Sequence, residues 1–198
     1  MAATEQLHRE VGPARTSIAD IARRAGVQRL TVYNTFPRSS DLFAACQHLF
    51  LSQNPPPSLR LPGAGEDAID CLQRAVRQLY RWYRANEAME RHVYRDRRLL
   101  PDLDALMRST ADARLDAVAD AIAQSLTSGK PGRALIRMAL DFRTWEMLAD
   151  NGLRDAEMAR LLIGAVNAVA GTSSGQSGQV TPRSTRTVGA TASAGQPS

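Results

Sequence analysis

The segment from residue 28 to residue 36 combines hydrogen-bonding and apolar side chains along one side of a predicted short helix. Val32 and Phe36 lie one turn apart and face inward. The other side chains cover the outer surface: Arg29, Leu30, Thr31, Tyr33, Asn34 and Thr35. Hydroxyl groups bind phosphates, and Arg or Asn can bind base edges in a DNA groove. This surface therefore predicts DNA reading; the competing interpretation of Arg29 is a solvated charge at a helix end.

A helix-turn-helix, roughly Thr16 to Phe36, would hold this face in place. Residues 17–25 predict its first helix with Thr16 or Ser17 as N-cap, because Ser17 and Asp20 have the spacing of a capping box. Its expected buried side consists of Ile18, Ile21, Ala22 and Ala25. Gly26 would supply the positive φ of a sharp turn, and Val27 is expected to fill the angle between the helices.

These residues belong to a longer motif that resembles the signature of the TetR/AcrR family of bacterial transcriptional regulators. The matching stretches are Thr16-Ser17-Ile18-Ala19-Asp20-Ile21-Ala22, Ala25-Gly26-Val27, Thr31-Val32-Tyr33, Phe36-Pro37 and Asp41-Leu42-Phe43. The resemblance implies an all-α fold. The fold that it implies has an N-terminal helix-turn-helix DNA-binding domain and a C-terminal helical bundle for ligand binding and dimerisation.

The resemblance also implies roles for individual residues. Thr31 and Tyr33 would hold phosphates, while Arg29 and Leu30 would reach base edges. A good bidentate contact from Arg29 to guanine is worth about 1–3 kcal/mol of discrimination. The complete expected DNA-binding set is Thr16, Ser17, Gln28, Arg29, Leu30, Thr31, Tyr33, Asn34, Thr35, Arg38 and Ser39.

Three features depart from the family pattern. Ser39 stands where a lysine usually begins the fourth helix, so Arg38, or Ser39 as N-cap and donor, is expected to replace that phosphate contact. Gln28 occupies a position where Ser or Thr is common, so the recognition helix is expected to start loosely. Residues 2–12 match only the second half of the family's first helix. Either the true start lies upstream of Met1 or this helix is frayed.

Hydrophobic periodicity predicts four more helices after residue 65. Apolar residues recur at helical spacing in four segments: about 66–86, 101–128, 133–151 and 154–170. The last two segments are apolar around more than one stripe, which favours homodimerisation through them. Gly152 is expected to be the left-handed cap between them, and Asp155 and Glu157 suit the start of the last helix.

Two stretches without helical periodicity divide the chain. Four prolines between Ser52 and Gly65 predict an extended connector, and the Gly, Ser and Thr content after Gly171 predicts a disordered tail. The expected parts are a DNA-binding domain (1–51), a connector (52–65), a ligand-binding and dimerisation domain (66–170) and a tail (171–198).

The resemblance further implies a pocket for an unknown small apolar ligand. The candidates to line it are Trp82, Tyr83, Met89, Tyr94, Leu103, Met107, Phe142 and Trp145. Methionine and aromatic side chains together suit an adaptable apolar site, although each candidate is otherwise ordinary core.

Other reactive side chains predict no catalytic, metal or cofactor site. His92 lies near Glu87, Glu90 and Asp96, but the spacing favours a solvated helix face over a metal or acid–base site. The two cysteines, Cys46 and Cys71, are expected to be buried thiols rather than redox sensors or a disulfide.

Composition supports a folded cytoplasmic protein. Hydrophobic residues make up 43% of the 198 residues, enough for a core, and no stretch resembles a membrane span or a secretory signal. The net charge of +5 is compatible with an anionic partner.

The expected function is a ligand-released repressor that binds a near-palindromic operator as a homodimer, with activation as an open alternative. Two other classes compete with it. One is an all-α small-molecule-binding or enzymatic protein with a degenerate DNA-reading head, and the other is an interaction adaptor that uses the apolar terminal helices.

Overall fold

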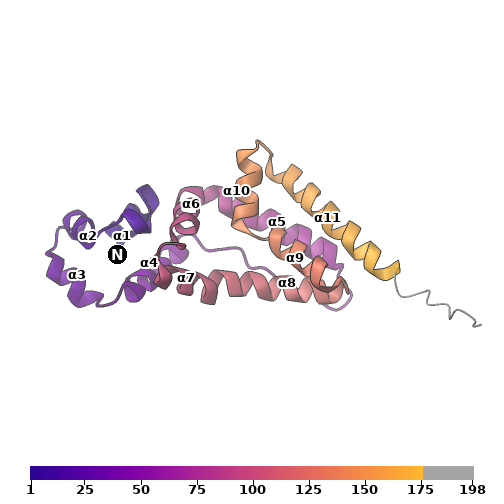
Figure 1. Cartoon of the computed structure of the whole chain (residues 1–198), viewed down its shortest axis with the longest axis horizontal. Coiled ribbons are helices and arrows are strands. Elements are labelled where there is room, and N and C mark those ends of the chain that lie inside the picture. The colour runs from indigo at the N-terminus through magenta and orange to yellow at the C-terminus, as the bar shows by residue number, and fades with distance from the viewer. Residues whose placement is uncertain (176–198) are drawn as a thin grey trace, which may run out of the picture.

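The structure, a computed structural model, describes residues 1–175, and every regular element among them is helical (Figure 1). The all-α prediction is therefore confirmed. In chain order the elements are α1 (Ala2–Glu10), η1 (Pro13–Arg15), α2 (Ile18–Ala25), α3 (Arg29–Thr35), α4 (Ser39–Gln53), α5 (Ala68–Ala85), α6 (Glu87–Asp96), α7 (Pro101–Met107), η2 (Arg108–Asp112), α8 (Ala113–Ser125), α9 (Gly129–Ala139), α10 (Phe142–Asp150) and α11 (Asp155–Gly175). None of the described helices has the length and apolar character needed to cross a membrane.

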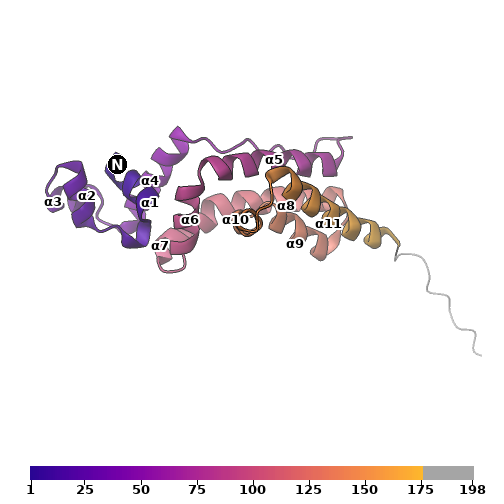
Figure 2. The same cartoon turned by 90° about the horizontal axis from the view of Figure 1, so that it is seen from above.

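The molecule is elongated, with a small head at one end and a larger helical body (Figures 1 and 2). Helices α1 to α3 form the head, whose core consists of Leu7, Ile21, Ala22, Val32 and Leu42. The body has its own core, in which α5 packs against α8, α10 and α11. Leu72, Val76 and Tyr80 give α5 a fully buried face, as the predicted apolar stripe of this helix requires.

Helix α4 joins the two cores. Leu42 belongs to the core of the head, whereas Phe43, the next residue, belongs to the core of the body. The helix packs against α1 on one side and against α7 on another. The head and the body therefore share one helix.

One helix prediction is wrong, and another holds with a local irregularity. The segment 133–151 is not one helix but two, α9 and α10, because Asp141 adopts an extended conformation and its carboxylate accepts a hydrogen bond from Arg143 N at 2.9 Å as the N-cap of α10. The predicted helix after Pro101 is helical without a break from Pro101 to Ser125, and it includes η2, a π-helical turn between α7 and α8.

The boundaries of the last helices also differ in part from expectation. Gly152 has the predicted left-handed conformation, with φ 82°, and Asp155 and Glu157 lie in the first turn of α11. Helix α9 begins at Gly129, within a stretch predicted to break helices. Helix α11 continues to Gly175, so the first residues of the predicted tail are helical; residues 176–198 lie outside the described part of the chain.

The proline-rich connector contains no helix between residues 54 and 67, as predicted. It lies along the body and is bound to it: Trp82 Nε1 donates a hydrogen bond to Asn54 O at 3.1 Å, and Cys71 Sγ donates to Arg60 O at 3.1 Å. The connector is therefore a packed part of the body surface.

Candidate DNA-binding face and ligand cavity

The helix-turn-helix forms by the local interactions expected of it. Ser17 is the N-cap of α2: its hydroxyl accepts a hydrogen bond from Asp20 N at 3.1 Å, and the Asp20 carboxylate accepts one from Ser17 N at 3.3 Å. Gly26 ends this helix with φ 67°. Gln28 occupies the N-cap position of α3 without a side-chain hydrogen bond. The recognition helix therefore lacks a side-chain cap, as expected for glutamine at this position.

Two details of the turn differ from expectation. Ala25 and Val27 are exposed, whereas both were expected inside. Leu7 of α1 and Leu42 of α4 complete the core of the head, and Val27 is not part of that core. The turn is held by the backbone, because Val27 N donates to Ala22 O at 3.0 Å.

The outer surface of α3 is open to solvent. Leu30 is 63% exposed and Tyr33 54% exposed, and the four polar residues of the predicted face are exposed as well. Within the described residues Arg29 has no ion-pair partner. By contrast, three other arginines of the head are paired with carboxylates at 2.6 Å: Arg23 with Asp20, Arg24 with Glu10 and Arg38 with Asp41. The Arg29 guanidinium is thus available to an external acceptor.

Several predicted contact residues already have internal hydrogen bonds. The hydroxyl of Thr16 donates to Gly12 O at 2.8 Å, and that of Thr35 donates to Thr31 O at 2.7 Å. Ser39 is the first residue of α4 rather than its N-cap, and its hydroxyl donates to the Asp102 carboxylate of α7. Ser39 was expected to bind phosphate; in the structure it connects α4 to α7 of the body instead.

Arg15 is a cation that the sequence analysis did not select. It is exposed, lies in η1 just before α2, and forms no ion pair within residues 1–175. Its place beside the N-terminus of α2 makes it a further candidate for binding phosphate.

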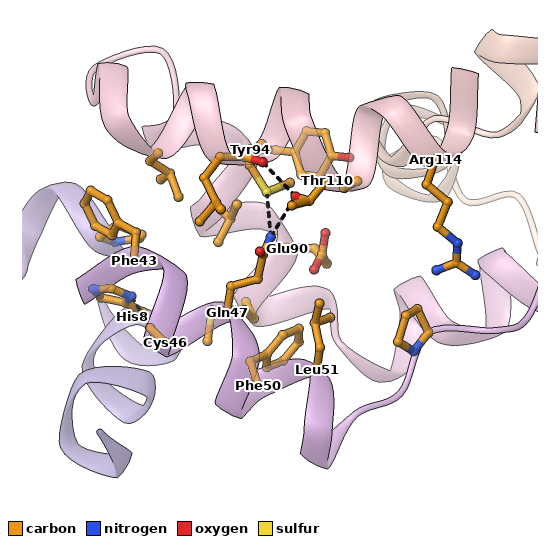
Figure 3. Close-up of a pocket in the computed structure, with 18 of the residues that line it drawn as sticks. His8, Phe43, Cys46, Gln47, Phe50, Leu51, Glu90, Tyr94, Thr110 and Arg114 are labelled. Atoms are coloured by element: carbon orange, nitrogen blue, oxygen red, sulfur yellow. Dashed lines mark hydrogen bonds between the residues drawn. The ribbon is translucent and has the colours of Figure 1, made fainter. Parts of the chain in front are cut away.

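A cavity of about 250 Å³ lies where the body meets the head (Figure 3). Six of the eight predicted pocket residues line it: Trp82, Tyr83, Met89, Tyr94, Leu103 and Met107. Phe142 and Trp145 do not. They are fully buried with ring centroids 5.5 Å apart, and they form part of the body core.

Helix α1 of the head and the shared helix α4 both contribute to the wall of this cavity. His8 of α1 and Phe43, Cys46 and Phe50 of α4 line it, together with Gln47, whose Nε2 donates to Thr110 Oγ1 at 3.1 Å (Figure 3). Periodicity could not reveal these residues as cavity residues, because their place depends on how two separate cores meet.

Glu90 also lines the cavity and is only 7% exposed. Its expected place on a solvated helix face is wrong. Its carboxylate forms no hydrogen bond or ion pair with any described residue, and burial raises its pKa to about 8. Sequence spacing could not detect this carboxyl, because a glutamate between Arg91 and Met89 is typical of an amphipathic surface helix.

The neighbouring face of α6 is only partly solvated, because it contacts the head and Asp96 is buried there. The Asp96 carboxylate accepts a hydrogen bond from Ala14 N at 2.9 Å, and Arg95 Nη2 donates to Val11 O at 3.0 Å. His92 Nδ1 lies 3.1 Å from His8 O. Gly12, with φ 97°, is buried among them, and a Cβ there would collide with the side chains of Arg95 and Asp96.

The two cysteines are buried thiols, as expected. Burial raises the pKa of Cys46 to about 12 and lowers that of its neighbour His8, whose Nδ1 lies 3.4 Å from the sulfur, to about 4. The pair is therefore uncharged near neutral pH. The described residues contain no group of three His, Cys, Asp or Glu side chains that could hold a metal ion.

Comparisons with known proteins agree with the head and with the overall fold. Residues 1–46 match the family described as bacterial regulatory proteins, tetR family. A TetR-like transcriptional regulator from Rhodococcus sp. RHA1 is similar in fold, with a TM-score of 0.55 and 18% identity over 88% of this chain and 93% of that one. A second TetR regulator from the same organism has a TM-score of 0.44 and 22% identity over 85% and 93% of the two chains. No curated protein matches the chain.

Proposed function

We propose that this chain, whose residues 1–46 match the tetR family of bacterial regulatory proteins, is a repressor released from DNA by a small molecule. In this proposal a dimer inserts two copies of α3 into successive major grooves. The grooves lie about 34–36 Å apart, so the operator is near-palindromic. The observation that carries the proposal is the exposed face of α3 around the unpaired Arg29.

The chemistry of this face supports a division of labour. Arg29 and Leu30 are proposed to read base edges, because a guanidinium matches guanine and an exposed leucine can contact a thymine methyl. Thr31 and Tyr33 are proposed to bind phosphates, with Asn34 in a secondary role. Arg15 joins the phosphate-binding set because no carboxylate of the described chain neutralises it.

Dimerisation is proposed to occur through α10 and α11. Met147 and Leu161 are exposed on these helices, at 57% and 55%. Leu161, Gly164 and Ala168 lie at helical spacing on α11 and are all exposed. A Cβ at Gly164 would meet no atom within 4 Å, so a second helix could approach closely there. This interface revises the predicted pair of helices, because the first of them is divided.

Release by a ligand is proposed to work through α4. The cavity wall includes α4 residues, and α4 also holds the head through Leu42. A ligand that favours another position of α4 changes the spacing of the two recognition helices, and the same coupling makes DNA weaken ligand binding. The functional units are accordingly proposed as a DNA-binding head (1–51) and a ligand-binding and dimerising body (66–170), with α4 in contact with both.

DNA binding is tested by fluorescence anisotropy with the DNA that flanks the gene, at two salt concentrations. Wild-type protein should bind with sequence preference and a steep salt dependence. Arg29→Ala should weaken operator binding by roughly 5- to 100-fold and reduce the sequence preference. Arg74→Ala, which removes the same charge from the body, should leave binding unchanged. An Arg29→Ala variant that binds like wild type would refute the assigned role, and a wild type without sequence preference would refute the regulator.

The dimer is tested by analytical ultracentrifugation of Leu161→Asp. A charge at the centre of the proposed interface should convert the dimer to a monomer. Leu99→Asp is the matched control, because Leu99 is 70% exposed and lies between α6 and α7. A Leu161→Asp protein that remains dimeric would rule out this interface.

A further inference from the structure

We propose that the cavity takes an organic cation with apolar substituents, and that Glu90 is the counter-ion of that ligand. The inference rests on the proposed function and names the chemical class of its ligand. Glu90 is more than nine-tenths buried, lines the cavity, and has no partner for its carboxylate among the described residues.

An unpaired carboxyl at such a site is costly, because burial without a partner destabilises the charged form. Figure 3 shows Glu90 among the side chains that surround the cavity. Arg114 is the one arginine among the described residues that line the cavity. Its guanidinium donates a hydrogen bond to Pro57 O of the connector. Burial alone accounts for the raised pKa of Glu90, so no cation among residues 1–175 neutralises it. A positive group from outside would supply the missing partner.

The rest of the wall selects an organic cation over a metal ion. Hard metal ions need several oxygen ligands, whereas Glu90 is the one carboxylate on this wall among the described residues. Five aromatic rings also line the cavity: Phe43, Phe50, Trp82, Tyr83 and Tyr94. Aromatic faces attract ammonium groups, and their apolar surface favours hydrocarbon substituents. A cavity lined by one carboxyl and several rings therefore matches a substituted ammonium ion.

The titratable groups that face the cavity make the proposal measurable. They are His8, Cys46, Tyr83, Glu90, Tyr94 and Arg114. His8, with its pKa near 4, and Cys46, with its pKa near 12, are uncharged between pH 6 and 8, and burial also raises the pKa of both tyrosines. Glu90 alone among them changes charge in that range. A bound cation should ionise it, so binding near pH 7 should release about one proton.

The probes are phenyltrimethylammonium and tert-butylbenzene, which have nearly the same shape but differ by one permanent positive charge. Binding to the full chain without DNA is measured by calorimetry at pH 6, 7 and 8. The cation should bind at least tenfold more tightly than the hydrocarbon at pH 8. Its affinity should rise up to tenfold per pH unit between pH 6 and 8, while that of the hydrocarbon should stay constant.

Glu90→Gln keeps the shape of the side chain and should abolish both the preference for the cation and its pH dependence. Glu87→Gln, on the same helix but outside the cavity, should retain both. Binding of tert-butylbenzene by Glu90→Gln shows that the cavity remains formed. Equal affinity of wild-type protein for the two probes, or undiminished cation binding by Glu90→Gln, would overturn the proposal.

Operator binding, measured separately, distinguishes the two proposals. If the hydrocarbon but not the cation binds and releases DNA, the regulator stands and the cationic ligand is refuted. If the cation binds through Glu90 in a protein that does not recognise DNA, the cation site stands and the regulator is refuted.

Discussion

Replacing Glu90 by Gln should stabilise the protein, and more so as the pH rises. The pKa of this carboxyl is about 8 in the folded protein, against an ordinary value of 4.5. The folded state therefore binds more protons than the unfolded state between these values, and stability falls as pH rises through that window. Because each pKa unit corresponds to about 1.4 kcal/mol, the loss reaches about 3 kcal/mol at pH 7 and approaches about 5 kcal/mol above pH 8.

Urea unfolding followed by tryptophan fluorescence measures this effect. The free energy of unfolding of wild type and Glu90→Gln is compared at pH 5, 7 and 8.5, at one protein concentration because the protein is proposed to be a dimer. The difference between the two proteins should be small at pH 5 and grow by several kcal/mol by pH 8.5. A constant cost or gain from burying the amide cancels in this comparison across pH.

Glu87→Gln serves as the control for the stability measurement. Glu87 pairs with Arg91 at 2.8 Å on the surface of the same helix, and its side chain is 39% exposed. Exposed ion pairs contribute little, so this variant should follow the wild-type profile across pH. If Glu90→Gln also runs parallel to wild type from pH 5 to 8.5, the carboxyl is ionised in the folded protein and the account of its burial is wrong.

Three further changes have defined outcomes. Wild-type protein should lose up to about 3 kcal/mol of stability on acidification from pH 6.5 to 4, because the pKa of His8 is lowered to about 4 in the folded state and the unfolded state binds the proton first. His8→Gln should remove this loss, and urea unfolding at pH 5 and 7 measures it. Gly12→Ala should destabilise the junction of head and body by about 1–3 kcal/mol and raise hydrogen exchange in α1, whereas Gly63→Ala, where a Cβ has room, should do neither. Ser17→Ala should cost about 1 kcal/mol of unfolding free energy through loss of the α2 cap, and unchanged urea midpoints would contradict that role.

The head was predictable because short-range rules determine it. The structure contains the predicted capping box of Ser17 and Asp20, the turn at Gly26 and the buried Val32. Each of these features depends on neighbours within a few positions of the chain. The exposed face of α3 follows from the same periodicity. Val27 was misassigned because its burial depends on α1 and α4, which are distant in sequence and already fill the core of the head.

The body was predicted less completely, because single residues change helix direction there. Asp141 caps a new helix inside an apolar run whose periodicity would allow continuation. The polar face of α6 was interpreted as solvated, since periodicity separates polar from apolar sides but cannot tell water from another polar surface. There Asp96 meets the backbone of the head, and Glu90 meets a cavity. The surroundings of Asp96 and Glu90 become visible only when the packing of the head against the body is known.

The sharing of α4 between two cores has a consequence for protein engineering. A chimera that joins this head to another regulator's sensor is naturally cut at the proline-rich connector, after Gln53. Such a cut transfers Phe43 and its neighbours on α4 away from the body they evolved with, although Leu42 stays with its own partners. A functional exchange would have to take the body-facing side of α4 from the regulator that supplies the sensor and keep the head-facing side from this chain. The boundary between the two parts therefore runs along the length of a helix rather than across the chain.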